Sequence, residues 1–278
     1  MNSAPLISIV TVCLNSADHI ERCINSVINQ SYTNIEYIII DGGSTDGTLD
    51  IIKSYEDKIN RWVSEKDRGI YDAMNKGIAI CTGEYIGLLN SDDYYAPDAV
   101  QVVVDAILTD STVEMVHGNI VVTHRERSEI LIGNHNDLLR HWSVYHNSCF
   151  ISSASYKLYK YDISIKISAD YDLVLKLYFN GRRFKHVDHV ILYFSPYGAS
   201  STPTWSERFV KFRIRAKYNL PVALKMLLKQ TVMHFDDKFY AFSSDDKYKT
   251  TVRYLLFSRI KNVIKPLYLF IKKSLLNT

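Results

Sequence analysis

The run Leu6–Leu14 is the feature that most limits what this chain can fold into. Its sequence, LISIVTVCL, is continuously apolar and rich in β-branched residues, which is the pattern of a strand buried on both faces of a sheet. Apolar residues with helical spacing follow over Ile20–Ile28, and a second buried strand follows at Ile35–Ile40. A short helix after Gly47 and a strand at Trp62–Ser64 continue the alternation. This order predicts a parallel, doubly wound α/β sheet with right-handed crossovers.

The alternation continues for one more unit before the pattern loosens. Short strand-like pieces dominate from Val113 onward, so we expect a mixed second half. Gly181 stands where a residue just past a helix end often adopts a left-handed conformation. The elements expected in this part are a helix over 70–81, a strand over 85–89, a helix opening at Pro97, strands over 114–123, 129–132 and 149–152, a helix over 170–180, and one or two strands over 183–194.

The net charge of +3 results from two regions of opposite sign. Residues 1–204 hold 17 Lys and Arg against 25 Asp and Glu, a net charge of −8, whereas residues 205–278 hold 16 against 5, a net charge of +11. An acidic body with a basic extension excludes a uniformly basic protein that binds nucleic acid. We therefore expect a globular body over 1–204 and a helical, basic C-terminal extension over 205–278.

Membrane-spanning and cysteine-based folds are not predicted. The chain has no apolar run of the roughly 18 to 20 residues that a spanning helix needs, and its first residues lack the basic region and cleavage site of a signal peptide. Cys13, Cys23, Cys81 and Cys149 are far apart and form no C-x-x-C pair, so neither a zinc site nor a disulfide framework is indicated. We expect a cytoplasmic protein with reduced cysteines.

Candidate ligand-binding residues stand at the ends of the predicted parallel strands, where open α/β sheets bind their ligands. Asn15 ends the first strand, Asp41 ends the second, and Asp92 and Asp93 follow the strand over 85–89. Several acids in one crevice are costly unless a cation is bound there, and a hard divalent cation that bridges phosphates is the usual partner. The glycine-rich loop after Asp41 has neither a P-loop lysine nor the G-x-G-x-x-G pattern, so phosphates would have to be held through such a cation.

These residues belong to a set of short stretches whose order and spacing resemble glycosyltransferase family 2. The resemblance covers about residues 6–202, and it is specifically to the single-domain enzymes of bacterial surface-polysaccharide assembly. It implies the GT-A fold, with a catalytic domain over 1–204 in which the donor half covers about 1–118 and the acceptor half about 119–204. The matching stretches are Ser8–Val12 with Asn15, Ile40–Thr48, Ala73, Asn75–Gly77, Thr82–Ile86, Asn90–Asp93, His146–Asn147, Ala169–Leu173, and Gly198 with Ser200.

The resemblance also implies roles for individual side chains. Asp170 would be the general base, which deprotonates an acceptor hydroxyl as this hydroxyl attacks the anomeric carbon of a nucleotide sugar with inversion. Asp93 and Asp92 would bind a divalent metal, Mn²⁺ or Mg²⁺, which offsets the charge on the leaving diphosphate. The donor-binding set would comprise Asn15, Asp41, Arg68, Asp72 and Asp92.

Three assignments stay open from the sequence. Asp172 competes with Asp170 for the role of base, and because residues two apart on a helix point about 200° apart, only one of them can face the crevice. His146 is a candidate for the acceptor side or a structural residue. His186 and His189 are candidates for a third metal ligand.

The chain departs from the family pattern at three positions, and these departures leave the identity of the nucleotide open. Gly42 stands where the family often has a second acid, Asn90 stands where the D-x-D element begins, and Met74 replaces a common arginine.

The implied activity is that of an inverting, metal-dependent hexosyltransferase. It would move a sugar from a nucleoside diphosphate sugar, with UDP expected, to a polyprenyl-diphosphate-linked oligosaccharide during the synthesis of lipopolysaccharide O-antigen or capsule. The alternatives are a polyprenyl-phosphate sugar synthase and a non-catalytic protein that binds a nucleotide sugar or acts as a membrane scaffold.

The basic extension suggests where such a protein works. Residues 251–276 place apolar side chains at helical spacing among Lys and Arg, a pattern that suits an anionic membrane surface. We expect a peripheral protein on the cytoplasmic face of the inner membrane, with packing of the extension on the catalytic domain as the alternative.

Overall fold

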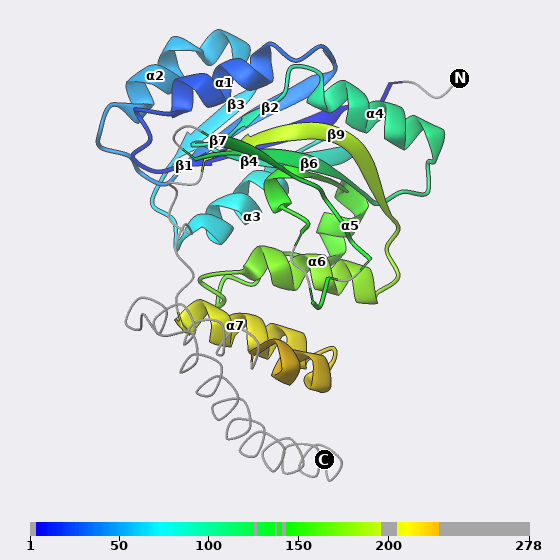
Figure 1. Cartoon of the computed structure of the whole chain (residues 1–278). Coiled ribbons are helices and arrows are strands. Elements are labelled where there is room, and N and C mark those ends of the chain that lie inside the picture. The colour runs from blue at the N-terminus through cyan, green and yellow to red at the C-terminus, as the bar shows by residue number, and fades with distance from the viewer. Residues whose placement is uncertain (1–3, 125–126, 137, 141–142, 196–204, 228–278) are drawn as a thin grey trace. The chain divides into compact units, whose positions relative to one another are not determined.

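The computed structural model shown in Figure 1 describes residues 4–124, 127–136, 138–140, 143–195 and 205–227. Contacts between Cα atoms divide the chain into two units, Met1–Thr202 and Pro203–Thr278. The basic amphipathic helix expected over 251–276 lies outside the described residues, as does the stretch with Gly198 and Ser200. No helix in the described part of the chain combines the length and apolar character needed to cross a membrane.

The first unit is built on one mixed sheet, which has nine strands within the described residues. Its order is β3-β2-β1-β4-β8-β6-β9-β5, with β7 paired to β6. The strands are β1 (Ile7–Cys13), β2 (Ile35–Asp41), β3 (Arg61–Ser64), β4 (Tyr85–Asn90), β5 (Tyr94–Tyr95), β6 (Met115–His124), β7 (Arg127–Leu131), β8 (Cys149–Ser152) and β9 (Phe184–Phe194).

Parallel pairing dominates the first half of the sheet. Strands β3, β2, β1 and β4 are parallel neighbours, which confirms the doubly wound arrangement predicted from the apolar runs. The second half is mixed, because β8 is antiparallel to both β4 and β6 whereas β9 is parallel to β6. This mixed, mostly parallel sheet covered by helices is the predicted fold class.

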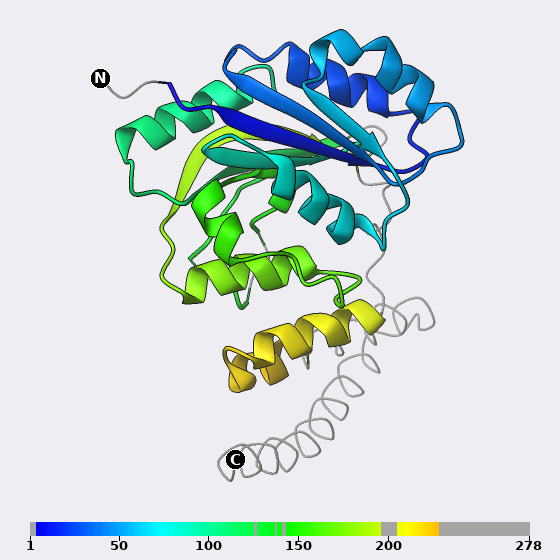
Figure 2. The same cartoon turned by 180° about the vertical axis from the view of Figure 1, so that it is seen from behind.

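Helices cover both faces of the sheet. Figures 1 and 2 show α1, α2 and α4 on one face and α3, α5 and α6 on the other. The helices of the first unit are α1 (Ile20–Ile28), α2 (Thr48–Ser54), α3 (Ile70–Ile80), α4 (Ala99–Thr109), α5 (Ser153–Leu158) and α6 (Ala169–Phe179), with the 3₁₀ turns η1 (Glu56–Lys58) and η2 (His146–Ser148). In the second unit, α7 (Trp205–Ala216) contains an ion pair of 2.6 Å between Lys211 Nζ and Glu207 Oε1.

The centre of the sheet sets the position of the candidate site. Every residue of β1 is buried, as expected for a strand with parallel neighbours on both sides. Gly77 lets α3 lie close to this strand, because a Cβ atom at this position would be only 2.3 Å from Cγ1 of Val10. The first turn of α3 is thereby held near the carboxyl ends of β1 and β2, where ligands bind in such sheets.

The structure corrects several sequence-based element boundaries. Helix α4 begins at Ala99 with Asp98 at its N-cap position, so Pro97 precedes the helix instead of opening it. A single strand, β9, occupies the region where one or two were expected, and Gly181 has the predicted positive φ of 70°. The two-residue strand β5 and the six-residue helix α5 were not predicted, because neither is long enough to produce a periodic pattern.

Candidate active site

Asn15 links the loops that follow β1 and β2. It adopts a left-handed backbone conformation with a φ of 49°, which is tolerated by Asn better than by most residues. Its side-chain Oδ1 accepts a hydrogen bond of 2.9 Å from the backbone amide of Thr45. Its backbone N–H donates to Ser44 Oγ at 2.7 Å. Asn15 therefore lies at the expected end of the sheet, and its side-chain Oδ1 is hydrogen-bonded to the loop that follows β2.

Asp41 is fully buried at the end of β2. Its Oδ2 accepts hydrogen bonds of 3.0 Å from the amides of Gly43 and Ser44 and one of 2.6 Å from the hydroxyl of Ser64. Burial alone would raise the pKa of Asp41, but these bonds, together with one from the Ser44 hydroxyl, hold this pKa below its ordinary value. The ionised carboxylate thus shapes the loop after β2, and its direct contact with a nucleotide stays a prediction.

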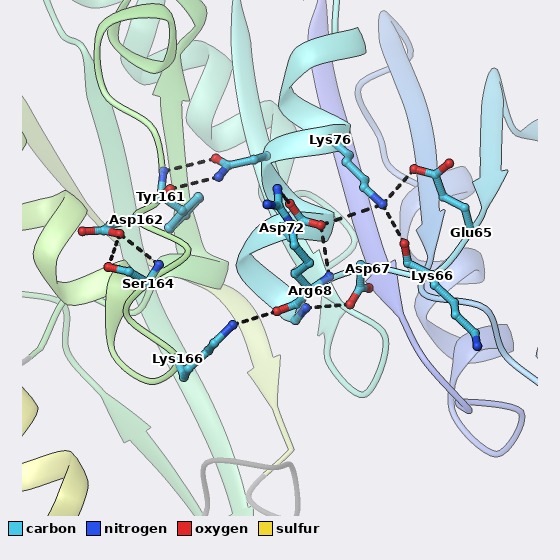
Figure 3. Close-up of polar contacts among 12 residues, drawn as sticks. Glu65, Lys66, Asp67, Arg68, Asp72, Lys76, Tyr161, Asp162, Ser164 and Lys166 are labelled. Carbon is cyan, nitrogen blue, oxygen red and sulfur yellow. Dashed lines mark hydrogen bonds and ion pairs between the residues drawn. The ribbon is translucent and has the colours of Figure 1, made fainter.

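A network of charged side chains lies at the first turns of α3 (Figure 3). Arg68 Nη2 is 2.9 Å from Asp72 Oδ1, and the Arg68 amide donates to Asp72 Oδ2 at 3.1 Å. Lys76 Nζ lies 3.9 Å from the same Asp72 Oδ2 and 2.7 Å from Glu65 Oε1. The hydrogen bonds from Arg68 lower the pKa of Asp72.

Arg68 and Asp72 differ strongly in how much of each side chain is exposed to solvent. The Asp72 side chain is 10% exposed, whereas the Arg68 side chain is 71% exposed, and Lys166 Nζ donates to the Arg68 carbonyl at 3.1 Å. Asp72 therefore orients Arg68, and the guanidinium remains accessible. An accessible, oriented guanidinium is suited to bind phosphate.

Asp93 is a buried carboxylate that follows β4, with only 1% of the residue exposed. Its Oδ1 accepts a hydrogen bond of 2.8 Å from the amide of Ser195, and its Oδ2 accepts one from Asn147 Nδ2. Burial and, secondly, the charge of Asp92 raise the pKa of Asp93 to about 8. Burial also raises the pKa of Asp92, whose carbonyl accepts a bond of 3.0 Å from Arg22 Nη2.

The residues around Asp92 and Asp93 fit a hard divalent cation. Two adjacent carboxylates offer the oxygen ligands that Mg²⁺ and Mn²⁺ prefer, and a cation would favour the ionised form of both acids, whose pKa values are raised first by burial. Among the described residues, no group of three or more His, Cys, Asp or Glu side chains is arranged to hold a metal. Asp92 and Asp93 are the described residues that would hold such a cation.

Neither of the two candidates on β9 for a third metal ligand is placed with Asp92 and Asp93 in the described part of the chain. His189 Nε2 lies 3.0 Å from Asp98 Oδ1, and His186 Nε2 lies 2.9 Å from Asn119 Oδ1. The parallel register of β6 and β9 places His186 opposite His117, and neither histidine joins Asp92 and Asp93 in a group of metal ligands.

Asp170 stands at the start of α6 between two hydrogen-bonding groups. Its Oδ2 lies 3.2 Å from His146 Nδ1, and its Oδ1 accepts a bond of 3.1 Å from the Tyr71 hydroxyl. Burial would raise the pKa of Asp170, but the hydrogen bond and charge of His146, together with hydrogen bonds from the backbone amide of Tyr171 and the hydroxyl of Tyr71, hold this pKa below its ordinary value. The carboxylate is thus held ionised and oriented, as a proton acceptor must be.

Asp172 occupies a different environment from Asp170. It is fully buried, and its Oδ2 forms an ion pair of 2.6 Å with Lys176 Nζ one turn further along α6. The structure therefore brings His146 to Asp170 and not to Asp172, and the ion pair with Lys176 favours a structural role for Asp172.

Three residues that hold the candidate acids were not assigned roles from the sequence. Asn147 and Ser195 contact Asp93, and Tyr71 contacts Asp170. Asn147 belongs to a stretch that resembles the family, so the sequence indicated that this position matters, but it did not predict the contact with Asp93. The other two have no sequence signal, because their contacts depend on how distant segments pack together.

Comparison with known proteins identifies the family of the chain. Residues 8–167 match the family model for glycosyl transferase family 2. The chain is 32% identical to a chondroitin synthase of Escherichia coli over 206 residues, which are 68% of this chain and 29% of that protein. It is 30% identical to a hyaluronan synthase of Pasteurella multocida over 257 residues, which are 89% of this chain and 26% of that protein. The chain thus spans less than a third of the length of these two synthases.

Solved structures show the same fold at low sequence identity. Staphylococcus aureus TarS 1–349 in complex with UDP-GlcNAc superposes with a TM-score of 0.64 and 17% identity, covering 87% of this chain and 74% of that one. A mannosyltransferase of Pyrobaculum calidifontis in complex with GDP-Man and Mn²⁺ gives a TM-score of 0.59 and 17% identity, covering 94% and 88%. These likenesses establish the GT-A fold.

Proposed function

The chain belongs to glycosyltransferase family 2, and we propose that it transfers a sugar, with inversion, from a nucleoside diphosphate sugar to a lipid-linked oligosaccharide during the synthesis of a bacterial surface polysaccharide. One observation carries this proposal: the Asp170 carboxylate is held between His146 Nδ1, 3.2 Å from its Oδ2, and the Tyr71 hydroxyl, 3.1 Å from its Oδ1, while the adjacent carboxylates Asp92 and Asp93 follow β4. The pKa of Asp170 is lowered and that of Asp93 is raised. Such a divergence is typical of acids with different roles in one active site.

Asp170 is suited to act as the general base. The acceptor hydroxyl gives its proton to the Asp170 carboxylate while its oxygen forms a bond to the anomeric carbon. The bond from this carbon to the diphosphate oxygen breaks at the same time, and the electron pair leaves with the nucleoside diphosphate. A single displacement on the face opposite the leaving group inverts the anomeric configuration. His146 and Tyr71 keep the receiving oxygens oriented.

Asp92 and Asp93 are the residues that would hold the divalent cation, Mn²⁺ or Mg²⁺. When bound, the cation supplies Lewis-acid stabilisation of the charge that develops on the leaving diphosphate. Support comes from the oxygen-rich donor set and from the Mn²⁺ named with the mannosyltransferase of the same fold. The exposed guanidinium of Arg68 would bind the same diphosphate.

The donor is proposed to be a UDP-hexose. The TarS complexes contain UDP or UDP-GlcNAc, whereas the mannosyltransferase complex contains GDP-Man, so the nucleotide requires a direct test. Thermal unfolding of the full chain would be measured with a panel of nucleotide sugars, with and without MnCl₂. Because a ligand that binds only the folded state raises its stability, the true donor should produce the largest metal-dependent increase in melting temperature.

The acceptor is proposed to be carried on a polyprenyl diphosphate at the cytoplasmic face of the inner membrane. The support is the basic character of residues 205–278, which suits an anionic lipid surface. Flotation with anionic vesicles tests this location. The full chain should float, and a variant with Lys261, Lys265, Lys272 and Lys273 replaced by Gln should float less; equal flotation would reject the membrane proposal.

The reaction itself is tested by release of the nucleoside diphosphate in the presence of acceptor. Asp93→Ala and Asp170→Asn should each abolish transfer while the protein stays folded, and near-normal turnover of either would reject its assigned role. A comparison of a polyprenyl monophosphate with a diphosphate-linked saccharide separates the proposed transferase from a polyprenyl-phosphate sugar synthase. If no acceptor or metal supports release, the chain is a binding protein.

A further inference from the structure

Asp93 and Asp170, the proposed metal ligand and the proposed base, are contacted by two consecutive residues, Asn147 and His146. On the 3₁₀ turn η2, His146 Nδ1 lies 3.2 Å from Asp170 Oδ2, and Asn147 Nδ2 donates to Asp93 Oδ2. Asp93 follows β4 and Asp170 lies in the first turn of α6, so the two acids are far apart in the sequence and the local chain does not fix one relative to the other. Within the described residues, the turn η2 contacts both acids and so links their positions.

We propose that η2 is a positioning element shared by the two halves of the site, in which Asn147 orients Asp93 toward the cation and His146 orients Asp170 toward the acceptor. This inference rests on the proposed function, because it assigns the turn a role in a metal-dependent transfer. It makes Asn147 a positioning residue for a metal ligand, and such outer partners are typically worth 10- to 100-fold in metal affinity or activity.

The burial of Asn147 supports this role. Only 1% of the residue is exposed, and its amide has Asp93 as a hydrogen-bond acceptor, while its Oδ1 has no hydrogen-bond partner among the described residues. A buried amide oxygen without a partner is costly in a folded protein. If Asn147 served only to fill space, an apolar side chain would do so without burying an unpartnered oxygen. The hydrogen bond to Asp93 is therefore the better explanation for an amide side chain at this position.

The anchoring of the turn makes it rigid enough to position two groups. Ser148 is fully buried, its amide and its hydroxyl each donate to the Tyr145 carbonyl at 2.9 Å, and Cys149 Sγ donates to the same carbonyl at 3.2 Å. Cys149 is also the first residue of β8. The turn is therefore fixed directly to a strand in the sheet, and a change at Ser148 should move both His146 and Asn147.

The test measures binding and turnover separately. Calorimetry of the full chain with UDP plus MnCl₂, without acceptor, reports the cation side, and kcat at saturating donor and Mn²⁺ reports the base. Asn147→Ala and the similarly sized Asn147→Leu, which both remove the donated N–H, should weaken Mn²⁺-dependent UDP binding 10- to 100-fold. His146→Gln should lower kcat at least 10-fold and change UDP binding less than 3-fold. Ser148→Ala should weaken both.

Two controls separate the possible failures. Ser155→Ala changes a serine that is equally buried but donates to Glu114 at 3.2 Å, and it should leave both readouts unchanged. Asp93→Ala tests the cation site itself. If Asp93→Ala binds UDP with Mn²⁺ as the wild type does, the proposed metal site fails. If Asp93→Ala loses binding but both folded Asn147 variants retain it, only the positioning role is overturned. Melting temperatures without ligand identify variants that do not fold.

Discussion

His146 Nδ1 lies 3.2 Å from Oδ2 of Asp170, and these two residues come from different segments, the turn η2 and the helix α6. The contact explains how a carboxylate that is only 16% exposed in its side chain can stay ionised, because a hydrogen bond to the charged form lowers the pKa. Tyr71 holds the second carboxylate oxygen. The arrangement favours Asp170 as the proton acceptor. Substitution of Asp172, the other acid in the first turn of α6, should therefore have a different effect.

Replacement of Asp170 by Asn should remove most of the turnover, with a moderate loss of stability because the contact with His146 is weakened. The amide has nearly the same shape but cannot accept the proton, so kcat should fall about 10²- to 10⁴-fold, the usual value of general base catalysis. Nucleoside diphosphate release at saturating donor and acceptor measures this change, and melting temperature serves as the folding control.

Replacement of Asp172 by Asn should instead reduce stability. It breaks the buried ion pair of 2.6 Å with Lys176, and hydrogen bonds to charged groups contribute about 1.5 to 3 kcal/mol. Urea denaturation measures the free energy of unfolding. If Asp172→Asn is stable but has no turnover while Asp170→Asn is active, Asp172 is the general base and Asp170 has the structural role.

Arg68→Ala should weaken donor binding without destabilising the protein. The Arg68 side chain is 71% exposed, and exposed ion pairs contribute about 0 to 1 kcal/mol to stability. Loss of a charged hydrogen bond to phosphate should raise the KM for the donor about tenfold or more. Lys53→Ala removes an exposed ion pair of 3.9 Å with Asp50 on α2 and is the matched control. Equal KM values for the two variants would argue against a role of Arg68 at the diphosphate.

The sequence predicted the first half of the fold well because of how parallel sheets are buried. Strands β1, β2 and β4 are covered on both faces, so their residues form continuous apolar runs that can be recognised without an alignment. It also predicted that Asn15, Asp41 and Asp93 lie at strand ends, because chain order and the parallel pairing determine this placement.

The partners of the acids could not be predicted in the same way. Asn147 is 54 positions from Asp93, and Tyr71 is 99 positions from Asp170. Such contacts depend on the tertiary packing of η2 and α3 and leave no local pattern. The surroundings of His186 could not be predicted for a related reason, since the register that pairs β9 with β6 places it opposite His117.

Gly77→Ala should destabilise the first unit. The new Cβ would lie 2.3 Å from Cγ1 of Val10, a buried residue of β1, so the helix or the strand must shift. Overpacking of this kind costs about 1 to 3 kcal/mol, which corresponds to a fall of about 2 to 12 °C in melting temperature for a domain of this size. Ala79→Ser, at an exposed position of the same helix, should leave the melting temperature unchanged. Equal melting temperatures for both variants would show that α3 is not held against β1 as described.

His117 should make the protein less stable in mild acid. The residue is fully buried, and its Nε2 lies 2.8 Å from His135 Nδ1. Burial, and then the neighbouring His135 and His186, lower the pKa of His117 to about 3, whereas an unfolded histidine titrates near about 6.5. Between these values the unfolded state binds the extra proton. The free energy of unfolding should therefore fall as the pH is lowered from about 6.5 toward 3, by up to about 1.4 kcal/mol per pH unit.

A variant without this imidazole separates the contribution of His117 from those of the carboxylates. His117→Gln is expected to be less stable than the wild type at pH 7.5, because it loses the contact with His135. Its free energy of unfolding should nevertheless change less between pH 7.5 and pH 5.0, by about 1 to 2 kcal/mol, as measured by urea denaturation at both values. His19→Gln, at an exposed position, should keep the wild-type pH dependence. If His117→Gln keeps that dependence as well, the histidine is protonated in the folded protein, and the packing of β6 against His135 must accommodate a charge.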